Sequence, residues 1–100
     1  MKTYQLVSIP EADADVEATF TWYENERELL GADFLSEVRA TYDRIVEYPM
    51  QYEEIHANVR RAFTRRFPYA VYFAIADNTV VVFAVLHASR DPAVWQSRTR

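Results

Sequence analysis

Apolar residues in the first half of the chain recur every three or four positions, the spacing that places them on one face of an α-helix. A run of β-branched and aromatic residues, 4–9, comes first and predicts a short strand. Pro10 predicts the start of a helix, because a proline at the first helical position lacks only an N–H that has no partner within the helix. The first helical stripe contains Ala12, Val16, Phe20 and Tyr23.

A second helical stripe follows Gly31, which is the only glycine in the chain. We expect Gly31 to end the first helix, because the left-handed residue that follows a helix is most often glycine. The second stripe reaches Tyr48, and Pro49 stops it. Its apolar members are Phe34, Leu35, Val38, Tyr42, Ile45 and Val46. The two stripes predict a helical hairpin, and residues 50–58, which show no period, predict a loop.

Strand-like runs replace the helical pattern in the second half of the chain, at residues 59–67, 69–76 and 79–87. Asp77 and Asn78 separate the last two runs and tolerate the positive φ angles of a tight hairpin turn, so we expect an antiparallel meander. The third run is nearly all apolar, which is typical of an interior strand that is buried on both faces.

The first of these runs differs from the other two, because it contains four arginines and is therefore typical of an edge strand. After the last run, Asp91 and Pro92 predict a short terminal helix that includes Trp95. Taken in order, the elements predict an α+β fold in which a helical hairpin packs on a small, mainly antiparallel sheet.

The composition supports one compact domain, residues 1–100, because half of the positions are apolar and 15% are aromatic. The chain has no cysteine, which excludes a disulfide framework and thiolate metal sites. Residues 1–10 contain no apolar run of signal-peptide length, and no stretch of about eighteen uncharged apolar residues occurs. We therefore expect a cytoplasmic protein that needs no membrane, metal or cofactor.

The net charge of −4 conceals a division along the chain. Residues 1–55 carry thirteen Asp and Glu against four Lys and Arg, whereas residues 56–100 carry two against seven. A basic half suits an anionic partner, which is either nucleic acid or an acidic protein segment, and the sign of the charge does not distinguish them.

Residues 60–66 are the strongest local signal, because four of these seven residues are arginine. In a regular strand, Arg61 and Arg65 share one face, while Arg60 and Arg66 share the other. One interpretation is a binding surface, since guanidinium groups match carboxylates and phosphates in two-pronged geometry. The other is an edge strand that uses charge to prevent unwanted pairing. We place the binding surface slightly ahead.

The two histidines and the tryptophans are the remaining candidates. His87 ends the apolar run, where it could act as a general acid or base, although a half-buried histidine bonded to a backbone carbonyl is the more common case. His56 lies in the predicted loop, where we expect it to face water. Trp22, Tyr23 and Trp95 could anchor a partner, but core packing explains them more simply.

Several short stretches, spread over almost the whole chain, have a distinctive order and spacing. They are Pro10-Glu11-Ala12 with Asp15 and Val16, Trp22-Tyr23, Gly31 with Phe34 and Leu35, Tyr48-Pro49, Val59-Arg60-Arg61, Arg65-Arg66-Phe67-Pro68-Tyr69, Val71-Tyr72, Val85-Leu86-His87, Arg90-Asp91-Pro92 and Trp95. In this order they resemble the toxins of the RelE/ParE superfamily, from bacterial type II toxin-antitoxin pairs, which are also known as plasmid stabilisation proteins. The resemblance implies a β-α-α-β-β-β fold with a possible C-terminal helix. It also implies a cognate antitoxin with an acidic, helix-forming tail.

The superfamily divides by activity, so the resemblance leaves the cellular target open. RelE-type toxins are metal-independent mRNA interferases that act on the ribosome, whereas ParE-type toxins inhibit growth by binding DNA gyrase. The second half of this chain has no lysine, and Trp95 lies where RelE-like enzymes tend to carry a tyrosine, so we place gyrase binding ahead. A toxin-like binding module without activity is a third alternative.

The resemblance also implies roles for individual residues. A nuclease would use Arg61, Arg65 and His87. The residues expected to bind the antitoxin or the target are Arg60, Arg61, Arg65, Arg66, His87, Arg90 and Trp95.

Overall fold

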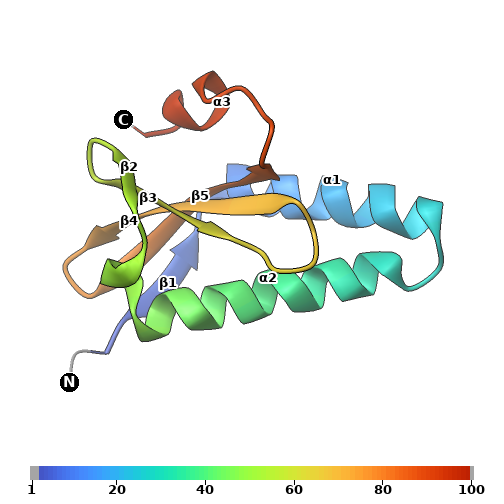
Figure 1. The fold of residues 1–100 in the computed structure, drawn as a ribbon, viewed down its shortest axis with the longest axis horizontal. Coiled ribbons are helices and arrows are strands. Elements are labelled where there is room, and N and C mark those ends of the chain that lie inside the picture. Colours follow the sequence, from blue (N-terminus) through green and yellow to red (C-terminus); the bar gives the residue numbers. More distant parts are fainter. Residues whose placement is uncertain (1–2, 100) are drawn as a thin grey trace.

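Two long helices pack on one face of a five-stranded sheet in the computed structural model, which describes residues 3–99 (Figure 1). The helices are α1 (Pro10–Glu26) and α2 (Leu30–Glu47). The sheet has the order β1-β5-β4-β3-β2. Its strands are β1 (Gln5–Ser8), β2 (Glu54–His56), β3 (Val59–Phe63), β4 (Tyr69–Ala76) and β5 (Thr79–His87). β1 runs parallel to β5, and all other neighbours are antiparallel, so the predicted α+β fold and the antiparallel meander are confirmed.

Two apolar clusters, one on each face of the sheet, hold the layers together. The cluster under the helical hairpin contains Ala12, Phe34, Val38, Ile45, Ala62, Phe67, Val71, Phe73, Val80, Val82 and Val85. The cluster on the opposite face contains Val59, Ala70, Tyr72, Phe83, Ala84, Leu86 and Trp95. β5 contributes to both clusters, so the prediction of an interior strand buried on both faces is confirmed.

The turn between the two helices differs from the prediction. Leu29, and not Gly31, adopts the left-handed conformation, with φ of 72°, while Gly31 lies in the first turn of α2. The Glu24 carboxylate accepts hydrogen bonds of 2.9 Å from the backbone N–H groups of both residues, which stabilises this turn. A Cβ atom at Gly31 would lie 2.7 Å from the Phe20 carbonyl oxygen. Glycine is therefore needed here for close helix packing and not for a positive φ.

The segment between α2 and β4 corrects two further predictions. Residues 50–58 are not only a loop, because they contain most of a short 3-10 helix (Pro49–Gln51) and the strand β2. β2 pairs with β3 and forms the sheet edge, so the arginine-rich strand is not the edge strand.

The predicted strand over residues 59–67 also ends early, at Phe63. The Thr64 hydroxyl donates to the Phe67 carbonyl, and the Thr64 N–H donates to the Tyr69 carbonyl over 2.9 Å. A threonine side chain that bonds to nearby backbone favours a turn over a continued strand. Residues 64–68 therefore form a loop, which carries Arg65 and Arg66.

The predicted terminal helix is confirmed as α3 (Ala93–Gln96), which packs on the sheet face opposite the hairpin (Figure 1). The indole of Trp95 stacks on the ring of Tyr72, with centroids 5.1 Å apart and planes 15° apart. His56 is exposed, as expected, and its ring lies 6.1 Å from that of Trp95. Trp95 is buried, so core packing is its role within this chain.

Candidate partner-binding surface

The first two arginines of the basic segment point to opposite faces of β3. Arg60 shares the helix-facing side with Ala62, which belongs to the core cluster under the hairpin. Its guanidinium donates to the carbonyls of Tyr52, over 2.6 Å, and Met50, over 3.4 Å, and lies 3.7 Å from a carboxylate oxygen of Glu54. Only 17% of the Arg60 side chain is exposed, so this residue holds the segment before β2 in place.

Arg61 lies on the other face of β3, together with Phe63. Its guanidinium carbon lies 4.8 Å from the centroid of the exposed Phe63 ring, and one nitrogen lies 3.8 Å from a Glu53 carboxylate oxygen. The two side chains form a cation-π pair on the surface, and such pairs contribute roughly 0.5–1 kcal/mol at exposed sites.

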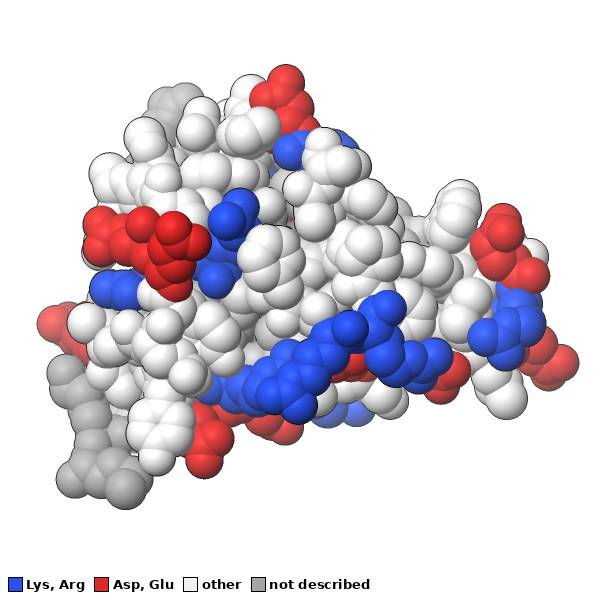
Figure 2. Space-filling view, in the orientation of Figure 1, with Lys and Arg blue, Asp and Glu red and all other residues white. Residues whose placement is uncertain are grey.

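The other two arginines, Arg65 and Arg66, lie on the exposed loop that follows β3. The Arg66 guanidinium lies 3.8 Å from an Asp33 oxygen, and the Arg66 N–H donates to Glu37 over 2.9 Å, which ties the loop to α2. The Arg65 side chain has no hydrogen bond or ion pair within residues 3–99. Figure 2 shows a band of arginine side chains across one face of the molecule, with carboxylates directly beside it.

His87 lies at the end of β5 on the helix-facing side, two residues after the core residue Val85. Its Nδ1 accepts a 3.1 Å hydrogen bond from the Ser89 N–H, and the Ser89 hydroxyl oxygen lies 2.8 Å from the same nitrogen. His87 therefore accepts a hydrogen bond from a backbone amide, where a bond to a backbone carbonyl was expected. Because Nδ1 accepts this bond, the neutral ring of His87 carries its proton on Nε2. Arg90 lies nearby in the exposed turn after β5.

The structure separates the three residues of the nuclease alternative. Arg61 points to the face that α3 covers, whereas His87 points to the face that the hairpin covers, and Arg65 lies on the loop beyond β3. The sheet therefore keeps Arg61 and His87 apart.

An apolar groove on the helical hairpin was not indicated by the sequence pattern. This hairpin groove has a volume of about 340 Å³, and its apolar wall consists of Val16, Phe20, Leu35, Val38 and Tyr42. Asp13, Glu17 and Arg39 line its rim. Burial, together with the nearby charges of Asp13 and Asp15, raises the pKa of Tyr42 to about 12, so its phenol is neutral at physiological pH.

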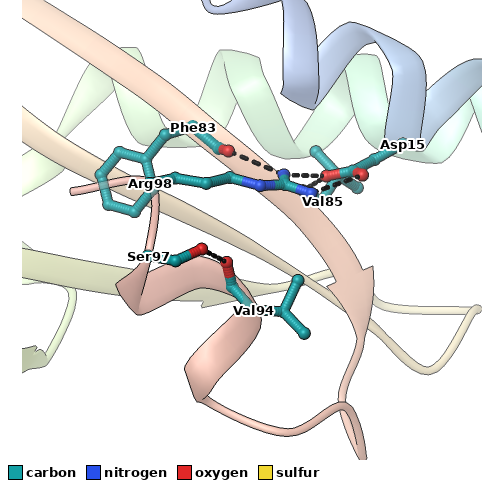
Figure 3. A network of polar contacts seen from close by, with 6 residues as sticks. All are labelled: Asp15, Phe83, Val85, Val94, Ser97 and Arg98. Carbon is teal, nitrogen blue, oxygen red and sulfur yellow. Dashed lines mark hydrogen bonds and ion pairs between the residues drawn. The ribbon is translucent and has the colours of Figure 1, made fainter.

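A part-buried ion pair at the C-terminal end was also missed. Arg98 contacts both carboxylate oxygens of Asp15, at 2.6 and 3.2 Å, and donates to the Phe83 carbonyl over 3.0 Å (Figure 3). The Val85 N–H donates to the same carboxylate over 3.0 Å. The hydrogen bond to Asp15 raises the pKa of Arg98, and burial opposes this only in part. The pair fastens the segment after α3 to α1 and β5.

Trp22 contradicts the core-packing interpretation, because 58% of the residue is exposed. Its ring makes an edge contact with Tyr23, at 5.1 Å, and Tyr23 is half-buried against Phe34 and Phe67. The helical spacing already separated the two residues, because the predicted stripe of α1 contains Tyr23 and leaves out Trp22.

Comparison with solved structures shows that this arrangement of hairpin and sheet is a known fold. The chromosomal ParDE toxin-antitoxin system from P. aeruginosa contains a chain with a TM-score of 0.76 and 13% identity, over 85% of this chain and 96% of that chain. The toxin-antitoxin complex RelBE2 from Mycobacterium tuberculosis contains one with a TM-score of 0.62 and 19% identity, over 85% of this chain and 98% of that chain. The fold is that of the RelE/ParE toxins.

Residues 9–92 match the family described as the ParE toxin of the type II toxin-antitoxin system parDE. The chain belongs to the ParE toxin family and is a toxin of a type II toxin-antitoxin system. No curated protein sequence matches it significantly. No helix in the described part of the chain is long and apolar enough to cross a membrane.

Proposed function

We propose that this toxin inhibits growth in the cytoplasm by binding DNA gyrase, and that it does so without cutting RNA. The placement of Arg61 and His87 on opposite faces of the sheet carries this proposal. A metal-independent nuclease needs its acid-base group and its phosphate-binding cations around one scissile phosphate. Membership of the ParE family supports the same conclusion.

Two assays with the purified toxin test this function. We expect the toxin to inhibit DNA supercoiling by gyrase and to leave mRNA intact on translating ribosomes. The His87→Ala variant serves as the matched control, because His87 is the only acid-base candidate among the three nuclease residues. RNA that is cut by the original toxin but not by His87→Ala would overturn the proposal. Harmless expression without any antitoxin would instead favour an inactive binding module.

We also propose that an antitoxin with an acidic, helix-forming tail neutralises this toxin. The hairpin groove supports this, because its five apolar side chains fit the apolar stripe of one amphipathic helix. Arg65 and Arg66 supply exposed positive charge for the carboxylates of the tail. A disordered tail that folds on binding can cover both regions at once.

The test uses the polypeptide encoded by a short reading frame next to the toxin gene. We expect Arg65→Gln to weaken its binding about fivefold or more, whereas Arg27→Gln, an exposed arginine in the turn between the helices, leaves binding unchanged. Equal dissociation constants for both variants would refute the role of Arg65. The absence of any binding by this polypeptide would refute the partnership.

A further inference from the structure

A second groove lies between α1 and the neighbouring ends of β4 and β5. It has two lobes, of about 380 and 120 Å³, which share Ala18, Thr19, Tyr69 and His87. Because the lobes share these residues, they form one trough, here named the His87 groove. The larger lobe continues to Trp22, and the smaller lobe continues to Arg90.

The larger lobe has an aromatic wall. The rings follow one another at centroid distances of 5.1 Å for Trp22 and Tyr23, 6.2 Å for Tyr23 and Tyr69, and 5.4 Å for Tyr69 and His87. Trp22 is 58% exposed although it lies on a rigid helix. An exposed tryptophan on a rigid support is typical of a residue that anchors a partner. This end of the groove suits a large apolar side chain.

The smaller lobe offers hydrogen-bond donors and one uncompensated positive charge. The Asp15 carboxylate is already paired with Arg98 and accepts from the Val85 N–H. The Arg90 side chain has no such partner within residues 3–99. The Nδ1 atom of His87 is occupied by Ser89, which leaves the Nε2–H as the free donor of the neutral ring. This end of the groove suits a carboxylate.

The length of the groove fixes the spacing between these two groups. Asp15 and Trp22, which mark its ends along α1, are seven residues apart, or about 10 Å at 1.5 Å per residue. An extended peptide covers about 3.3 Å per residue, so roughly three of its residues fit. In an extended segment, residues two positions apart point to the same side.

We propose that the His87 groove binds an extended tripeptide of the antitoxin tail, in which an acidic residue and a large apolar residue lie two positions apart. The carboxylate contacts Arg90 and the His87 Nε2–H, and the apolar side chain packs on Trp22 and Tyr69. The proposal rests on the antitoxin partnership proposed above. It adds a second anchor, separate from the hairpin groove.

The experiment measures binding of the adjacent-frame polypeptide to toxin variants by calorimetry. We expect Trp22→Ala and Arg90→Gln each to raise the dissociation constant about tenfold. Trp22→Phe retains an aromatic wall and should lose much less. Tyr48→Ala and Arg27→Gln are the matched controls, because both residues are exposed and neither lines this groove. Thermal unfolding confirms that each variant folds.

Substitutions in the tail locate the two contacts. We expect a tail carboxylate whose replacement is non-additive with Arg90→Gln, and an apolar tail residue, two positions away, whose replacement is non-additive with Trp22→Ala. Tight binding that is unaffected by Trp22→Ala and Arg90→Gln would overturn the groove proposal and leave the antitoxin partnership standing. No binding to the unaltered toxin would overturn both. Coupled tail residues at any other spacing would overturn the extended tripeptide.

Discussion

The pair between Asp15 and Arg98 is expected to contribute strongly to stability, because both side chains are largely buried, with 14% and 18% exposed. Asp15→Ala removes both contacts to Arg98 and leaves the Val85 N–H without its acceptor. Arg98→Met keeps the apolar stem of the side chain and removes the guanidinium. The two variants, with their combination, make a double-mutant cycle.

The magnitude follows from the contacts that each change removes. Hydrogen bonds to charged groups contribute about 1.5–3 kcal/mol, and an unsatisfied backbone N–H costs about 1 kcal/mol more. Asp15→Ala should therefore lower the free energy of unfolding by about 3 kcal/mol, and Arg98→Met by about 2 kcal/mol. For a domain of this size, the larger loss lowers Tm by roughly 10–20 °C. The double variant should lose less than the sum, with a coupling energy of about 1–2 kcal/mol.

Urea unfolding, followed by circular dichroism and by tryptophan fluorescence, measures these free energies. Arg98 follows α3 in sequence, so loosening it should also expose Trp95 and shift its emission to longer wavelength. The coupling energy should persist at roughly 0.5 M salt, because part-buried ion pairs are screened less than exposed ones. A coupling energy below about 0.3 kcal/mol would refute this reasoning and leave the stacking of Trp95 on Tyr72 as the main anchor of the C-terminal segment.

Three further predictions concern single residues. Gly31→Ala should destabilise the fold by about 1–2 kcal/mol, because the added Cβ would lie 2.7 Å from the Phe20 carbonyl oxygen. This loss should outweigh the higher helix propensity of alanine. A rise in the urea midpoint of the variant would contradict the prediction. The raised pKa of Tyr42 means that the folded state favours its neutral phenol, so the folded state is stabilised below pH 10. This stabilisation, of about 2–3 kcal/mol, is lost as the pH rises to about 12. Tyr42→Phe should remove the loss when the free energy of unfolding is measured at several pH values. Arg60→Gln should lower the free energy of unfolding by about 1–2 kcal/mol, because the hydrogen bonds of Arg60 to the Tyr52 and Met50 carbonyls are lost. Arg65→Gln should change it by less than about 0.5 kcal/mol. Equal urea midpoints for the two variants would show that Arg60 is not structural.

The helical hairpin and the interior strand β5 could be predicted from the sequence, because their signals are local. A stripe with helical spacing indicates a helix that is buried on one side, and a run of apolar β-branched residues indicates a strand that is buried on both faces. The turn at Leu29 could not be predicted, because it depends on the Glu24 carboxylate and on the packing of Gly31 against Phe20. A glycine between two helices indicates a special requirement, but the sequence does not show whether that requirement is a backbone angle or a close contact.

The candidate site was predicted less completely, for a related reason. Four arginines in seven residues mark a basic region, but their directions depend on where β3 ends and on the three-residue strand β2. β2 is too short to have a period of its own, and the end at Phe63 is set by bonds of Thr64 to residues 67 and 69. The contact between Asp15 and Arg98 joins positions 83 residues apart, so no local pattern reports it.

The pairing of β1 with β5 has a consequence for the order of events during synthesis. β1 emerges from the ribosome before the other strands, but within residues 3–99 its only strand partner is Thr79–Val82, which belongs to the last strand, β5. The helical hairpin can form early from local contacts, while the sheet closes only when the last strand is available. The sheet of the nascent toxin therefore stays open until β5 has emerged from the ribosome, well after the helical hairpin is complete.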